Sequence, residues 1–346
     1  MFNFVLTKKE VLIGAKEIKR NWPANLSDGD KALFQKEQNR YLDPVNLNTY
    51  KNNFVNSSGI IFSYLQVEKD CLIWDTHIPF YSSVYIVKQY IKKTQRILDK
   101  NKTAILCFDY WSDGYFHWIC EALPRILLIE ERLSSENIVL LLPERFRNSS
   151  FYTATLNAFR NIAFEWISEN DILKCTNLLV PGRVAPSGSN NPEYIKQVQK
   201  RMLEHFGNTL HPYKNIYVSR KRTKRRKVLN EDKVIEMLQR FDFEIICFED
   251  FSFEGQVNIM QKTKNCISIH GANLTNTIFM NEGSNVLEFR MKNDSENNYY
   301  YALATACGVN YFYQTCEFKM FSTDGNDFNL KVDLLELERN IKRMIN

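Results

Sequence analysis

From residue 104 onwards, short apolar runs alternate with segments whose apolar residues recur at helical spacing. A strand at 104–108 is followed by a turn-rich loop and by a helix over 115–133. Strands at 138–142 and 177–181 enclose a further helix at 151–160. Strands that alternate with helices form parallel βαβ units, so this pattern predicts an α/β fold.

A second series of the same kind follows a stretch rich in turn formers at 181–193. Its expected strands lie at 216–219, 243–247, 266–269, 285–289 and 309–314, and its helices at 192–206, 231–241, 253–262, 274–280 and 299–307. We therefore expect two doubly wound domains, 1–190 and 191–330, that face a central cleft. A closing helix at 331–346 could pack back on the first domain. Ligands of such sheets bind beyond the carboxyl ends of the strands.

The first hundred residues are less regular. Strands at 59–66 and 71–75 and an amphipathic helix at 82–98 are expected there. The eight cysteines are scattered without CxxC spacing, which indicates buried reduced thiols. No apolar run reaches the roughly 18 residues of a membrane span, and the apolar stretch at the N-terminus is too short for a signal peptide. We expect a cytoplasmic protein.

Seven of the eight residues from Arg220 to Lys227 are basic, in a chain whose formal net charge is only +5. This octet connects an expected strand to an expected helix. Arginine grips phosphate oxygens bidentately and neutralises the charge that builds on a leaving diphosphate. Arg220, Arg225 and Arg226 are our candidates for that contact. Lys221, Arg222, Lys224 and Lys227 are expected to be solvated neighbours. Two alternatives are sequence-independent binding of a nucleic-acid backbone and a merely solvated face. The compact run and the lack of a recognition motif argue against nucleic acid.

Two further features of the second half suit a nucleotide. After the strand at 266–269 come His270, Gly271, Ala272 and Asn273, whose small residues let the backbone approach a ligand at a helix N-terminus. A tight turn with Asn273 as helix cap is the alternative, and His270 could donate to phosphate or be a boundary histidine. Glu288 ends the strand at 285–289; it could bind ribose hydroxyls or pair with Arg290.

In the first half, His117 and Glu121 are four residues apart and would share one helix face. Either could take the proton from an attacking hydroxyl. The alternative role of Glu121 is a favourable interaction with the helix dipole. No third ligand for a metal is evident, and Asp109 and Asp113 do not have the spacing of a metal motif.

Together these motifs resemble those of glycosyltransferase family 61. The match consists of Phe116-His117-Trp118 with Glu121 and Leu123-Pro124-Arg125, of Tyr217-Val218-Ser219-Arg220 with Arg225-Arg226 and Asn230-Glu231, of the run from His270 to Asn276, and of Glu288. These blocks stand in order within roughly residues 104–290.

The resemblance implies a GT-B architecture of two Rossmann-like domains. It also implies inverting transfer of a sugar from a nucleotide sugar, usually a UDP-sugar, without a metal or other cofactor. The second domain would hold the donor, and Glu121 or His117 in the first domain would act as base for the acceptor. The implied donor residues are Ser219, Arg220, Arg225, Arg226, Asn230, Glu231, His270, Gly271, Ala272, Asn273, Thr275, Asn276 and Glu288.

We expect this chain to differ from the eukaryotic members in having no signal anchor. We therefore expect a cytoplasmic enzyme of surface polysaccharide or glycan biosynthesis. Its acceptor would be a glycan or lipid-linked glycan, reached by peripheral contact with the inner membrane face, and no nucleic acid is expected as a partner. The competing functions are a nucleic-acid-binding protein that uses residues 220–227 and a non-catalytic module that binds a nucleotide sugar. The sequence predicts no oligomeric state.

Overall fold

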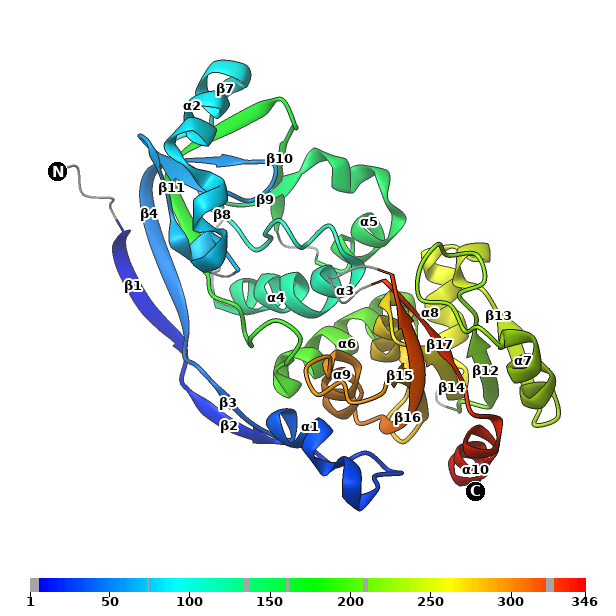
Figure 1. Ribbon diagram of the computed structural model, residues 1–346. Helices are drawn as coiled ribbons and strands as arrows, with labels where there is room; N and C mark the ends of the chain where they lie inside the picture. Colours follow the sequence, from blue (N-terminus) through cyan, green and yellow to red (C-terminus); the bar gives the residue numbers. More distant parts are fainter. Residues whose placement is uncertain (1–5, 74, 133–136, 160–161, 208–210, 322–326) are drawn as a thin grey trace. The chain divides into compact units, whose positions relative to one another are not determined.

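The computed structural model in Figure 1 describes residues 6–73, 75–132, 137–159, 162–207, 211–321 and 327–346. Two compact units are present. The first extends to Lys16 and from Leu42 to Val184, and the second comprises Glu17–Tyr41 and Ala185–Asn346. The division after Val184 lies near the boundary expected at residue 190. The sequence pattern did not indicate that Glu17–Tyr41 joins the second unit.

The first unit is built on a mixed sheet (Figure 1). Its strands are, in spatial order, β10 (Ala163–Ile167), β9 (Ile138–Pro143), β8 (Thr103–Ile105), β11 (Asp171–Pro181), β4 (Val45–Asn56), β5 (Ile61–Ser63) and β6 (Gln66–Val67), with β1 (Leu6–Ile13) on β4 and β7 (Thr94–Ile97) on β11. Pairing is parallel from β10 to β11 and antiparallel from β11 through β4 to β6. The α/β class is confirmed, but this sheet is only partly of the βαβ kind. Strand β4 was missed because it is rich in asparagine, a poor strand former.

The α-helices of this unit, among the residues that the structure describes, are α2 (Ser83–Lys92), α3 (Tyr115–His117), α4 (Leu123–Arg132) and α5 (Ser150–Leu156). The helix expected over 115–133 starts as α3, widens into a π turn at Trp118–Ala122 and continues as α4, while Leu133 lies outside the described residues. Pro124 has no N–H and its ring crowds the carbonyl four residues earlier, which favours such a widened turn. Residues 93–98, expected to be helical, instead leave α2 and form β7.

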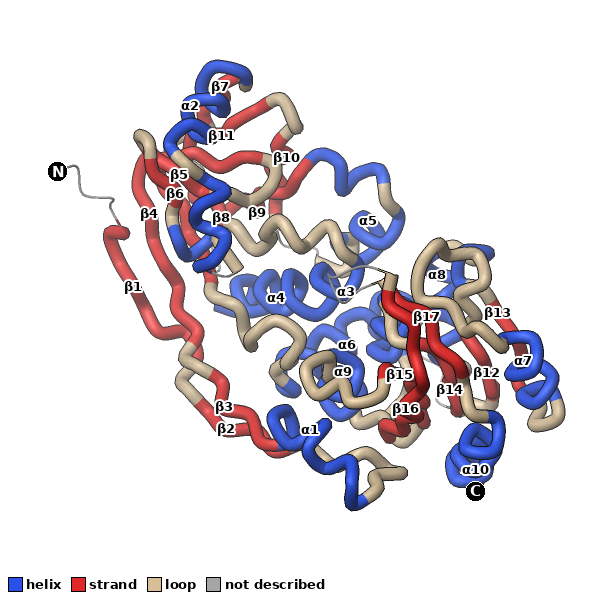
Figure 2. The backbone as a smooth tube through the Cα atoms, in the orientation of Figure 1, coloured by secondary structure: helices blue, strands red, loops and turns tan. Residues whose placement is uncertain are grey.

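The second unit has a mainly parallel sheet (Figure 2). Its order is β13 (Phe243–Ile246), β12 (Lys214–Val218), β14 (Thr263–Ile269), β15 (Asn285–Met291), β16 (Asn310–Met320) and β17 (Phe328–Lys331), of which only the β16–β17 pair is antiparallel in the described chain. The chain winds outward in opposite directions from β12 and β14, so the topological switch point lies between them. Asparagine side chains tie the amino ends of the strands together: Asn265 donates to Asn215, and Asn285 to Asn265, each at 2.7 Å.

The helices of this unit are α1 (Lys31–Gln38), α6 (Pro192–Phe206), α7 (Glu231–Gln239), α8 (Phe253–Gln261), α9 (Tyr299–Ala306) and α10 (Leu334–Ile345). Helix α6 begins where the sequence predicts, with Pro192 in its first turn and Asn191 accepting the Glu193 N–H at 3.2 Å. Helix α10 buries Leu337 and Ile341 in the core of the second unit. This differs from the expected packing of 331–346 on the first domain.

A short ribbon of β2 (Lys16–Lys19) and β3 (Asn39–Leu42) flanks the segment that joins the second unit. Buried Arg20 anchors this segment by donating to the backbone carbonyls of Asn190 at 2.8 Å and Ala302 at 3.4 Å. Seven cysteines are buried and Cys247 is half-buried, all as free thiols. Within the described ranges, no helix combines the length and apolar character needed to cross a bilayer.

Candidate functional site

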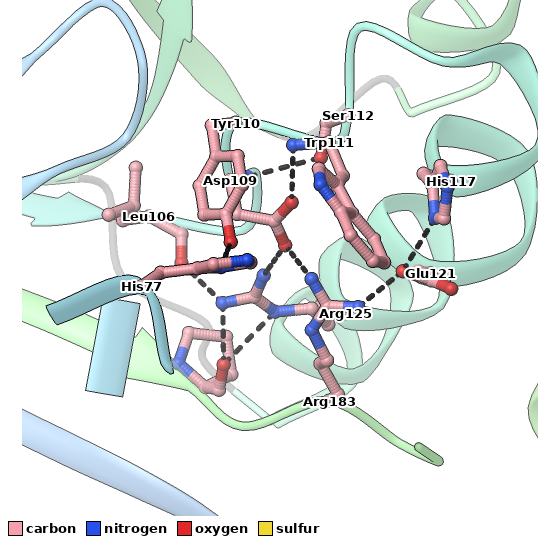
Figure 3. A network of polar contacts seen from close by, with 11 residues as sticks. His77, Leu106, Asp109, Tyr110, Trp111, Ser112, His117, Glu121, Arg125 and Arg183 are labelled. Carbon is pink, nitrogen blue, oxygen red and sulfur yellow. Dashed lines mark hydrogen bonds and ion pairs between the residues drawn. The ribbon is translucent and has the colours of Figure 1, made fainter. Parts of the chain in front are cut away.

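The π turn brings His117 and Glu121 together in the first unit (Figure 3). A π turn is wider than an α turn, so residues four apart come nearly into line. His117 Nδ1 lies 3.1 Å from Glu121 Oε2. The Trp111 ring packs against the imidazole with centroids 4.9 Å apart. The sequence prediction that these two side chains share a face is confirmed.

Arg183 extends this pair into a chain of alternating charges. Its Nη1 donates to Glu121 Oε2 and its Nη2 donates to Asp109 Oδ2. Arg125 lies on the other side of Asp109, with Nη1 3.7 Å from the same carboxylate oxygen. Each carboxylate therefore has an arginine beside it, and we call Arg125, Asp109, Arg183, Glu121 and His117 the relay.

Backbone carbonyls hold Arg125 in place. Its Nε and Nη2 donate to the Pro181 carbonyl at 3.0 and 2.8 Å, and Nη2 also reaches the Leu106 carbonyl at 3.2 Å. Burial lowers the pKa of Arg125, partly offset by Cys107 and Asp109. A pocket of about 340 Å³ is lined by Asp109, Arg125 and Arg183 together with apolar side chains such as Phe108. Charged donors and acceptors beside apolar walls suit a hydroxyl-bearing ligand.

The loop after β8 is fixed by its own hydrogen bonds. Asp109 Oδ1 accepts the Trp111 N–H at 3.0 Å, and Ser112 Oγ accepts the Asp109 N–H at 3.1 Å. Tyr152 donates to the carbonyl of Ser112 at 3.0 Å. One carboxylate thus holds both the Trp111 backbone and the Arg183 guanidinium.

The second unit gathers its cationic groups at the switch point between β12 and β14. Arg220 follows β12 and Gly271 follows β14. A Cβ added to Gly271 would clash with Arg220 Nη1 and would lie 3.5 Å from Arg226 Nη1. Glycine at this position therefore lets the Arg220 guanidinium approach the backbone closely, and the structure brings together Arg220, Arg226 and Gly271.

Two side-chain donors of Arg220 and Asn273 are buried in this part of the second unit. Within the described parts of the chain, Arg220 Nε and Asn273 Nδ2 are buried and have no hydrogen-bond partner. Burial lowers the pKa of Arg220, and the neighbouring positive charge of Arg226 lowers it further. Arg220 Nε, Asn273 Nδ2 and the backbone after Gly271 form a cationic, donor-rich site that suits an anion.

The basic loop is a folded element and not a tail. Thr223 Oγ1 donates to the Arg220 and Arg225 carbonyls at 2.9 and 2.8 Å, and Asn329 in β17 accepts the Lys227 N–H at 2.9 Å. Arg226 has φ +58°, and its guanidinium lies 5.7 Å from the Phe328 ring centroid.

Arg225 lies differently from its two predicted companions. Its Nε is 3.8 Å from Asp327 and its side chain is 60% exposed. Arg222 in turn pairs with Asp250. The structure thus separates Arg225 from the Arg220–Arg226 cluster, because the left-handed backbone at Arg226 turns successive side chains apart.

Glu288 does not offer its carboxylate to a ribose. It is fully buried, with Oε1 on His270 Nδ1 and Oε2 accepting from the Tyr311 hydroxyl. The ribose prediction is therefore not supported by the geometry. Arg290, the alternative partner, interacts electrostatically with Glu288 and hydrogen-bonds to Asn298 at 3.0 Å. Glu288 instead orients the His270 ring, which packs edge-on against Tyr300 at 5.1 Å.

Most of the six other predicted donor residues make contacts within the fold. Glu231 accepts from Ser219 Oγ at 2.8 Å and from the Tyr217 hydroxyl at 2.9 Å, which ties β12 to α7. Asn230 donates to the Val332 carbonyl at 2.9 Å. Thr275 and Asn276 are buried within the 3-10 helix Ala272–Phe279, which replaces the α-helix expected at 274–280. Ala272 is exposed at the start of that helix.

Sequence reasoning missed Asp109 and Arg183. Asp109 follows the strand β8, where ligand-binding residues are expected, but it was considered only as a metal ligand and rejected. Arg183 lies in the turn-rich stretch 181–193, and nothing in the sequence around it indicated a functional role. In the described residues, no group of three or more His, Cys, Asp or Glu side chains could hold a metal ion.

The comparisons with known proteins agree with the motifs. The family model described as Glycosyltransferase 61 matches residues 115–287, half of the chain. The EGF domain-specific O-linked N-acetylglucosamine transferase of Drosophila melanogaster is 36% identical over 98 residues, which is 28% of this chain and 18% of that protein. The chain thus matches less than a fifth of that relative's length. On the family match, which includes the relay residues His117 and Glu121 and the cluster at Arg220 and Gly271, the chain belongs to glycosyltransferase family 61.

Proposed function

We propose that this glycosyltransferase moves a sugar from a UDP-sugar to a hydroxyl of a glycan acceptor, with inversion and without a metal ion. The observation that carries the proposal is the meeting of Arg220 and Arg226 at Gly271, at the switch point of the second unit, where Arg220 Nε is buried without a hydrogen-bond partner among the described residues. Diphosphate is the anion that a nucleotide-sugar enzyme must hold, and it is the leaving group that must be neutralised.

In this proposal the donor diphosphate accepts from Arg220, Arg226 and the backbone that follows Gly271. The acceptor oxygen attacks the anomeric carbon from the face opposite the diphosphate. As the new carbon–oxygen bond forms, the bond to the diphosphate oxygen breaks and UDP leaves with the electron pair. Two guanidinium groups supply the positive charge that a metal ion provides in other transferases.

In this proposal, the proton of the acceptor hydroxyl is transferred to a side chain of the first unit. Glu121 Oε2 already accepts from Arg183, and the Glu121 side chain is 8% exposed against 21% for His117. We therefore assign the base to His117, with Glu121 orienting its ring and stabilising the imidazolium that forms. Arg183 and Asp109 position Glu121. We also propose the GT-B arrangement of two Rossmann-like domains that the family resemblance implies.

The same proposal includes the acceptor and the biological setting. The pocket beside Asp109, Arg125 and Arg183 suits the hydroxyl groups of a glycan. The activity for which the Drosophila relative is named makes N-acetylglucosamine the first donor sugar to test. A cytoplasmic role in surface polysaccharide or lipid-linked glycan synthesis remains the setting that we propose.

The test is a panel of nucleotide sugars with EDTA present, read as release of the nucleotide diphosphate and as thermal stabilisation by UDP. We expect stabilisation by UDP and turnover of at least one UDP-sugar. No turnover of any donor together with no stabilisation by UDP would refute the proposal. The nucleic-acid alternative is less favoured, because Arg222 and Arg225 have acidic partners and Arg220 and Arg226 lie at Gly271.

A further inference from the structure

Helix α2 carries large apolar side chains on its solvent face. Val84 is 61% exposed, Val87 39% and Ile91 78%, and Phe80 just before the helix is 73% exposed. Lys88 and Lys92 are exposed on the same helix. We call Phe80, Val84, Val87, Lys88, Ile91 and Lys92 the α2 surface. Apolar groups gathered in this way on a folded protein mark an interaction site.

The opposite face of α2 fixes the helix on the sheet of the first unit. Ile86 is fully buried, and the Tyr90 ring packs edge-on against Phe54 at 5.3 Å and Phe62 at 5.6 Å. Tyr85 accepts from Asn56 Nδ2 at 2.8 Å. Because this inner face is tied down, the apolar residues at Val84, Val87 and Ile91 cannot rotate into the core.

The spacing of the outer residues is that of an amphipathic stripe. Val84, Val87, Lys88 and Ile91 stand at intervals of three and four residues, so they follow one side of the helix. Helix α2 and strand β6 lie close together (Figure 2), so the helix is held against the edge of the sheet.

Its charge is of one sign. The sequence from Thr76 to Leu98 contains no Asp or Glu, and its basic residues are Lys88, Lys92, Lys93 and Arg96. Arg96 pairs with Glu165 at 2.6 Å. Among the residues that the structure describes, Lys88 and Lys92 have no acidic partner. The two lysines thus leave the α2 surface cationic as well as apolar.

We propose that the α2 surface docks on an anionic lipid bilayer. Apolar side chains on a fixed helix can enter the boundary between headgroups and acyl chains, and lysines beside them meet anionic headgroups. A second copy of the chain is a poorer fit, since a two-fold contact through this surface would oppose lysines to lysines. The surface is independent of the donor site, and it would bring the enzyme to a lipid-linked acceptor.

The experiment is co-sedimentation of the full chain with vesicles of phosphatidylcholine, with or without about one quarter phosphatidylglycerol. We expect binding to the anionic vesicles and much less to the neutral ones. Val87→Ser with Ile91→Ser should weaken binding about tenfold or more. Lys88→Gln with Lys92→Gln should remove the preference for phosphatidylglycerol.

The matched control is Leu229→Ser with Leu335→Ser, which alters two exposed apolar residues of the second unit and should leave vesicle binding unchanged. Thermal unfolding confirms that each variant is folded, and stabilisation by UDP reports the donor site separately. No binding to anionic vesicles, an equal loss in the control, or a dimer that Val87→Ser with Ile91→Ser dissociates would overturn the proposal. Vesicle binding without any response to UDP would instead count against the proposed function alone.

Discussion

The charged groups of the two units are arranged in opposite ways. In the first unit, Arg183 joins two carboxylates and Arg125 lies beside one of them, so the relay is compensated without a ligand. In the second unit, Arg220 and Arg226 meet beside Gly271, and Arg220 Nε has no hydrogen-bond partner among the described residues. A buried charge next to a like charge is costly unless an opposite charge joins it. This difference supports the proton-transfer site that we propose in the first unit and the anion site that we propose in the second.

The largest expected effect comes from removing the proposed base. His117→Gln should lower kcat by about a thousandfold, in the range of general-base catalysis, and leave UDP affinity unchanged. His205→Gln changes an exposed histidine on α6 and is the control. Glu121→Gln should cost less than His117→Gln, because the amide still packs beside the ring. A larger loss in Glu121→Gln would make Glu121 the base, and no loss in either would favour a non-catalytic module.

The next effect is on stability. Arg183→Met leaves Asp109 and Glu121 without their shared partner, and both are largely buried. Breaking such a network should reduce the free energy of unfolding by about 3 kcal/mol. The exposed Arg222–Asp250 pair provides the control, where Arg222→Met should cost at most about 1 kcal/mol. Urea unfolding of both variants measures the difference, and equal losses would contradict the proposed role of the relay.

A single methyl group should disturb the anion site. In Gly271→Ala the new Cβ clashes with Arg220, so the guanidinium must move away from the backbone. We expect UDP affinity to fall about tenfold, the loss of roughly one charged hydrogen bond. Gly29→Ala has no neighbour within 4 Å and should bind UDP as the parent does. Unchanged UDP affinity in Gly271→Ala would show that this backbone is not part of the donor site.

Metal removal should have the smallest effect. If Arg220 and Arg226 neutralise the diphosphate, EDTA should change turnover by less than about twofold. The measurement is the initial rate before and after chelation, with added Mg²⁺ as a second arm. Loss of activity on chelation and recovery with Mg²⁺ would show that the arginines do not replace a metal ion.

Local sequence signals were sufficient for the parallel strands of the second unit. Pro192 marks the start of α6, and the strand–helix alternation gives the strands that form its parallel sheet. The same signals failed for β4 and its antiparallel partners. Asn48 and Asn53 are buried in β4 although asparagine disfavours strands, and long-range pairing with β11 overrides that preference. Pairing of distant strands cannot be read from a local pattern.

The candidate site was predictable where motifs carried it. His117 and Glu121 were found by their spacing, and Arg220 and Gly271 by their places after strands. Arg183 was not found, since only the fold brings it to Asp109 and Glu121. Glu288 had the right place at a strand end, but its buried contacts with His270 and Tyr311 depend on side chains from other elements.

The central claim is that Arg220 belongs to a diphosphate site and Arg225 does not. Calorimetric titration of UDP into the parent, Arg220→Ala and Arg225→Ala in the presence of EDTA tests it directly. Loss of charge-assisted hydrogen bonds should weaken UDP binding to Arg220→Ala by about a hundredfold, while Arg225→Ala should stay within about threefold of the parent. Equal affinities in all three proteins, or a larger loss in Arg225→Ala, would contradict the claim.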